Sequence, residues 1–147
     1  MDVVRYMIQW GFFILIFCCG VLGLELAEGL KISTTEYFGL QNIGFVFIMM
    51  AFFFAVVLYP IVWLPLSIVI RKLIQKLWGR ILIYVLLGAI GGRMVFQVLY
   101  EQRFVTEYQL NMSSAYLIFA AIGLIYALTD YGLEQFSARI KGMQTAK

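Results

Sequence analysis

Four long apolar segments constrain what this chain can fold into. They cover residues 6–24, 44–70, 81–100 and 114–133. A helix needs about 20 mostly apolar residues to cross roughly 30 Å of hydrocarbon, and each segment meets that length. No segment shows the alternating pattern of a membrane barrel strand, so helices are the spanning structure that pairs every backbone group. The sequence therefore predicts a single membrane domain over 1–147, an all-α integral membrane protein built as a bundle of four transmembrane helices.

The composition excludes several classes of protein. Apolar residues make up 63% of the chain and charged residues only 13%, whereas soluble domains are nearer half apolar and a quarter charged. There is no histidine, which excludes His-based catalytic triads, His-ligated haem and most zinc or copper sites. No phosphate-binding glycine motif and no basic pattern typical of nucleic-acid binding occurs. We therefore expect no enzymatic activity, no catalytic or metal-binding residue, no cofactor and no nucleic-acid partner.

The basic residues predict how the chain is oriented. They are concentrated before the first segment, in the 71–80 connection and in the tail, where eight of the eleven lie, while the opposite connections carry two, Lys31 and Arg103. Short loops rich in Lys and Arg stay in the cytoplasm. We therefore expect a multi-pass cell-membrane protein with both termini cytoplasmic, as an even number of spans requires. The 71–80 connection mixes basic and apolar residues; we favour a plain topology signal, with contact to anionic membrane lipid as the alternative.

Two prolines interrupt the second segment. Pro60 and Pro65 each remove one backbone donor and crowd the preceding turn. The sequence therefore predicts a kink in the second helix. A bend that improves packing is the favoured interpretation, and a hinge or water-accessible break is the alternative.

The strongest anomaly is a charge inside the third segment. Arg93 lies about 18 Å beyond the inner boundary of that segment, at a depth where a charge is costly. Gln97 and Glu101 follow it on the same stripe of the helix. Glu25 lies closest to it in depth, so we predict a buried polar site of Arg93, Gln97, Glu25 and Glu101, with an Arg93–Glu25 ion pair. An anion or substrate contact in an outward-facing pocket and snorkelling to the headgroups stay open as alternatives.

Two further contacts are expected within the bundle. Asp130 lies near the cytoplasmic end of the fourth segment, where we expect it to pair with Arg80. Gly88 and Gly92 form a G-x-x-x-G pattern that lets membrane helices approach closely. We expect these glycines to pack against another helix of the same chain, with a dimer seam as the alternative.

These features favour a small polytopic membrane protein that acts by binding. It would be an accessory subunit or an immunity or stress-response type of factor, with membrane lipid, another membrane protein or a second copy of itself as partner. The alternative is a small oligomeric transporter or channel with a polar site around Arg93 and Gln97.

Overall fold

The computed structural model describes residues 2–145, which form helices and connecting turns with no strand among them. Four helices are long and apolar enough to cross a membrane: Val3–Lys31, Phe45–Leu73, Leu77–Leu99 and Met112–Arg139. The four segments predicted from the sequence are therefore confirmed as long helices. Local hydrophobicity and length were sufficient to find them.

The secondary structure divides these long helices further. Two short helices, α2 and α6, lie in the connections, and a π-helical turn, η2, divides the second span. In chain order the elements are α1 (Asp2–Ala27), η1 (Gly29–Lys31), α2 (Leu40–Ile43), α3 (Phe45–Leu58), η2 (Tyr59–Trp63), α4 (Leu64–Leu73), α5 (Leu77–Leu99), α6 (Gln102–Glu107) and α7 (Met112–Thr145).

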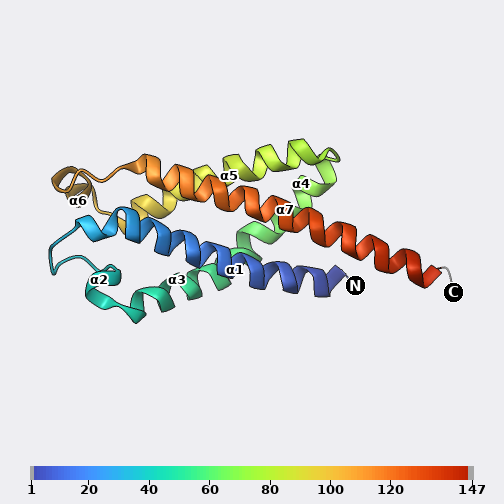
Figure 1. The fold of residues 1–147 in the computed structure, drawn as a ribbon, viewed down its shortest axis with the longest axis horizontal. Helices are drawn as coiled ribbons and strands as arrows, with labels where there is room; N and C mark the ends of the chain where they lie inside the picture. The colour runs from blue at the N-terminus through green and yellow to red at the C-terminus, as the bar shows by residue number, and fades with distance from the viewer. Residues whose placement is uncertain (1, 146–147) are drawn as a thin grey trace.

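The two ends of the bundle differ in what they carry. Figure 1 shows the start of α1, the end of α7 and the α4–α5 turn at one end, and α2 and α6 at the other. Helix α7 packs against both α5 and α1, and α1 also packs against α3. We refer below to the termini end and the α2–α6 end.

Glycines bring α5 and α7 into close contact. A Cβ atom on Gly88 would overlap the carbonyl oxygen of Phe119, and one on Gly123 would overlap the carbonyl oxygen of Tyr84. Gly92 lies over Ala115 and Phe119 of α7 in the same way. Gly88 and Gly92 therefore pack within the chain, as favoured from the sequence, and backbones this close gain extensive van der Waals contact.

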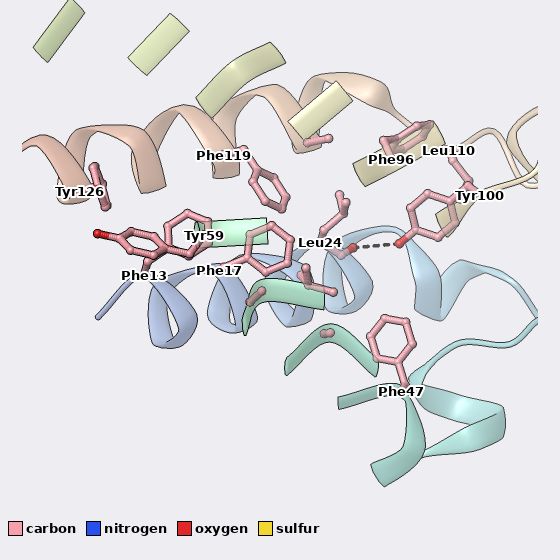
Figure 2. Close-up of a cluster of buried hydrophobic side chains, with 14 of the residues drawn as sticks. Phe13, Phe17, Leu24, Phe47, Tyr59, Phe96, Tyr100, Leu110, Phe119 and Tyr126 are labelled. Carbon is pink, nitrogen blue, oxygen red and sulfur yellow. Dashed lines mark hydrogen bonds between the residues drawn. The ribbon is translucent and has the colours of Figure 1, made fainter. Parts of the chain in front are cut away.

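Aromatic rings fill the space between the helices. Phe13 and Phe17 of α1 point toward Tyr59, Phe119 and Tyr126, which come from the second span and α7 (Figure 2). The ring centroids of Phe13 and Tyr59 are 5.3 Å apart, and those of Phe17 and Phe119 are 5.9 Å apart. Edge-to-face and tilted contacts at these distances are favourable for aromatic pairs. The outer faces of the helices expose many other large apolar side chains.

The second span contains an irregular turn at the prolines. Pro60 lies in η2, and Pro65 lies in the first turn of α4. A π-helical turn shifts the hydrogen-bond register by one residue, and such turns are frequent at functional sites and kinks. The proline-induced kink itself stays a prediction.

Candidate functional site

Arg93 lies on the outer surface of the bundle. Helix α5 turns Tyr84, Gly88, Gly92 and Phe96 toward the interior, and Arg93 lies on the opposite side, where its side chain is exposed. None of the ion pairs within residues 2–145 includes it.

Arg93 and Gln97 share a stripe of α5 that faces away from the bundle, whereas Glu101 lies beyond the end of that helix. Gln97 and Glu101 are exposed like Arg93. Around them are exposed apolar side chains, of which Met94 is 63% and Val98 80% exposed. The predicted buried site of Arg93, Gln97, Glu25 and Glu101 is therefore wrong in its burial, and only Glu25 is inside the bundle.

Glu25 has other partners, which explains why it does not meet Arg93. Its carboxylate is fully buried at the end of α1. It accepts hydrogen bonds from the Tyr37 hydroxyl at 2.7 Å, the Leu40 backbone N–H at 2.9 Å and the Tyr100 hydroxyl at 3.1 Å. Gly39 lies so close that a Cβ atom there would overlap the Glu25 carboxylate. The predicted Arg93–Glu25 pair is wrong because the 32–44 connection folds back over Glu25 and supplies donors that sequence depth alone did not reveal.

Burial keeps the Tyr37 phenol protonated, so that its O–H can donate a hydrogen bond. Removal from water, followed by the hydrogen bond to the Glu25 carboxylate, raises the pKa of Tyr37 above its ordinary value. Its ring also stacks on that of Tyr100, with centroids 5.8 Å apart. Nothing in the sequence pattern marked either tyrosine as a donor to Glu25.

A second buried carboxylate, that of Glu28, lies at the same end of the bundle, the α2–α6 end. Glu28 accepts hydrogen bonds from the Lys31 ammonium at 2.6 Å, the Asn111 backbone N–H at 2.8 Å and the Ser114 hydroxyl at 2.5 Å. It thereby joins the end of α1 to the beginning of α7. We call Glu25 and Glu28, with the groups that donate to them, the acidic cluster.

The termini end holds a second polar cluster, centred on Asp130. Its carboxylate is 1% exposed and accepts hydrogen bonds from Gln9 Nε2 at 2.8 Å and from Arg71 Nε at 3.0 Å. A terminal nitrogen of Arg71 also contacts the other Asp130 oxygen and donates to Gln9 Oε1 at 2.8 Å. Arg5 lies 3.7 Å from Asp130. We call these four residues the Asp130 cluster; it joins α1, α4 and α7.

The predicted Asp130–Arg80 pair is therefore wrong by one helical turn. Arg80 donates instead to Glu134 at 2.5 Å and to the Ile74 carbonyl at 2.7 Å. Glu134 lies one turn after Asp130 on α7, so both acids face basic residues of the same region. The role of Gln9 could have been suspected from the sequence, since it is the most polar residue inside the first apolar segment.

Arg93 lies within a membrane-length helix and belongs to neither cluster, and it forms no ion pair among the described residues. The buried carboxylates each have several donors, and they hold helices together. Within residues 2–145 there is no group of three or more Cys, Asp or Glu side chains placed to hold a metal ion. The exposed face of α5 is therefore the candidate functional site.

The chain matches no protein-family model, no curated protein and no solved structure.

Proposed function

We propose that this chain is a multi-pass cell-membrane protein with cytoplasmic termini that acts by binding another membrane protein and not by catalysis. The observation that carries the proposal is the exposure of Arg93 on α5 among apolar side chains. This surface suits an accessory subunit better than an isolated bundle, because a lone bundle would present the charge to lipid.

The depth of Arg93 makes a partner favourable. It lies six residues before the end of α5, so its Cα is about 9 Å below that of Leu99. A charge in the hydrocarbon costs about 2.5–3.5 kcal/mol on insertion scales and more in simulations. Side chains on a helix tilt toward its N-terminus, which for α5 is the cytoplasmic end in the proposed orientation. Snorkelling to the nearer headgroup layer would therefore work against the direction of the side chain.

The charge also favours a different protein over a second copy. In a symmetric pair formed by the same face of α5, Arg93 of one copy would lie opposite Arg93 of the other. Glu101 lies beyond the end of α5, and Leu99 is already about 9 Å from Arg93 along the helix, so Glu101 is too far away to neutralise that contact. A transmembrane helix that carries a carboxylate level with Arg93 fits the surface better.

Cross-linking from the face of α5 tests the proposal. With a photoreactive residue at Met94, we expect a discrete product with another membrane protein in intact cells. The same residue at Val57, exposed on α3, is the control and should give lipid adducts only. Arg93→Glu should reduce the Met94 product more than tenfold, because even about 1.4 kcal/mol is a factor of ten. Equal yields at the two positions, or no effect of Arg93→Glu, would contradict the proposal.

A small oligomeric transporter or channel is the second candidate. It is favoured by the exposure of Arg93 and Gln97 on one stripe, since a ring of copies with α5 toward the axis would place both along a pore. In that case the Met94 product would be a ladder of copies of this chain.

The orientation is tested separately by reporter fusions. Reporters fused after Lys147 and inserted within residues 31–37 should lie on opposite sides of the membrane. The termini end and the α2–α6 end are opposite in Figure 1, which supports this expectation. Reporters on the same side would contradict the four-span topology.

We also infer that the two prolines bend the second span, and the π-helical turn at η2 supports this. A straight helix would separate Val46 from Lys72 by about 39 Å. Spin labels at these exposed positions should give a shorter distance, which Pro60→Ala with Pro65→Ala should lengthen. An unchanged distance would show that the prolines do not cause a bend.

A further inference from the structure

The α4–α5 turn forms an open groove at the termini end. Its volume is about 700 Å³, and residues 73–79 line it. Most of the lining side chains are apolar, and two of them are prominent on the surface: Leu73 is 75% exposed and Trp78 is 81% exposed. Tryptophan side chains prefer the depth of the lipid headgroups.

Specific contacts fix the shape of this turn. The Arg80 guanidinium donates to the Ile74 carbonyl at 2.7 Å and to Glu134 of α7 at 2.5 Å. Gly79 also allows Ile74 to pack closely, since a Cβ atom there would lie 2.8 Å from Ile74 Cγ2. The groove is therefore held in place before any ligand arrives, which lowers the ordering cost of binding.

The charges around the groove are unbalanced. Arg71 and Arg80 are engaged by Asp130 and Glu134. Lys72 and Lys76 are exposed and form no ion pair within the described part of the chain. Two ammonium groups beside an apolar groove match a ligand that combines a phosphate with hydrocarbon.

We propose that this groove binds an anionic phospholipid, with Lys72 and Lys76 at the headgroup phosphate and with Leu73 and Trp78 against the glycerol and acyl chains. A soluble phosphate would use the lysines but not the apolar lining, so a lipid is the occupant that uses both. The inference rests on the proposed membrane insertion and not on the partner proposed for Arg93.

Fluorescence quenching of Trp78 tests this proposal on the full chain. The protein is reconstituted in phosphatidylcholine vesicles that contain increasing fractions of brominated phosphatidylglycerol, or of brominated phosphatidylcholine as the neutral probe. The Trp78 signal is the difference between the protein and its Trp78→Phe variant. We expect half-quenching at a much lower fraction of the anionic lipid than of the neutral one.

Charge variants separate lipid binding in the groove from the general attraction between basic residues and an anionic membrane. A basic residue near an anionic membrane contributes about fivefold to binding, so Lys72→Gln with Lys76→Gln should raise the half-quenching fraction roughly thirtyfold. Both side chains are exposed, so this variant should keep its fold. Arg103→Gln, at the opposite end, is the matched control and should leave the fraction unchanged.

Three results would overturn the proposal. The first is equal quenching by the two brominated lipids, and the second is a double-lysine variant that behaves like Arg103→Gln. The third is full protection by soluble glycerol phosphate, which would identify a phosphate site and not a lipid site. Because these readouts do not depend on Arg93, they distinguish failure of the lipid site from failure of the protein partner proposed for α5.

Discussion

Replacing Asp130 with alanine should lower the free energy of unfolding by roughly 3–5 kcal/mol, the usual cost of removing one member of a buried ion pair. The change leaves the Arg71 guanidinium, which is 11% exposed, without its carboxylate, and it leaves the Gln9 amide without an acceptor. Arg71→Ala should cost a similar amount because it strands Asp130. The double variant should lose less than the two single losses added together, since neither charge is then unpaired.

Thermal unfolding in mild detergent measures these differences. Glu36→Ala is the control, because Glu36 and Arg103 form an ion pair in which the two side chains are 66% and 63% exposed. An exposed pair of this kind contributes about 0–1 kcal/mol. If Asp130→Ala cost no more than Glu36→Ala, or if the losses in the double variant were additive, the Asp130 cluster would not hold the three helices together.

Replacing Glu25 with alanine should destabilise the α2–α6 end by roughly 3 kcal/mol or more, because each buried donor left without an acceptor costs about 1–3 kcal/mol. The Tyr37 hydroxyl and the Leu40 backbone N–H lose their acceptor, and the Tyr100 hydroxyl keeps only the Leu24 carbonyl at 3.4 Å. Because two of these groups lie in the 32–44 connection, that segment should lose its hydrogen-exchange protection before the helices do.

Single-donor variants and an exposed acid provide the controls. Tyr37→Phe removes one of the three donors and should cost about 1 kcal/mol, the typical net value of one hydrogen bond. Glu36→Ala removes a carboxylate in the same connection whose ion pair with Arg103 is exposed, so it should be nearly neutral. A loss for Glu25→Ala no larger than that for Glu36→Ala would show that the acidic cluster does not hold this end together.

The positions of the spans could be predicted from the sequence, whereas the rotation of each helix could not. Hydrophobic length is a local property, and it also fixes the depth of a residue along its helix. Depth did not say which way the side chain of Glu25 or Arg93 points, and Glu25 meets Tyr100, which follows Arg93 by about two helical turns. Gly88 and Gly92 held the missing signal, because small residues mark the side of α5 that meets another helix. Successive residues are 100° apart, so Arg93 is turned well away from that side.

The Asp130 cluster shows the same limit at closer range. Charge and depth correctly predicted that Asp130 would meet a basic residue of the 71–80 connection. They did not distinguish Arg80 from Arg71, because these residues stand at the two ends of that connection and so lie at a similar depth. Arg71 meets Asp130, and Arg80 meets Glu134, one turn further along α7.

The Asp130 cluster also links the order of synthesis to the completion of the bundle. Its basic and amide members lie on α1 and α4, which the ribosome makes early, while the carboxylate arrives with α7, the last helix. Until then Arg5 and Arg71 lack the carboxylate that neutralises them, and the Gln9 amide lacks an acceptor. A chain released before α7 would therefore expose two uncompensated basic residues where the complete bundle buries an ion pair, so that the bundle becomes stable only when translation reaches its last helix.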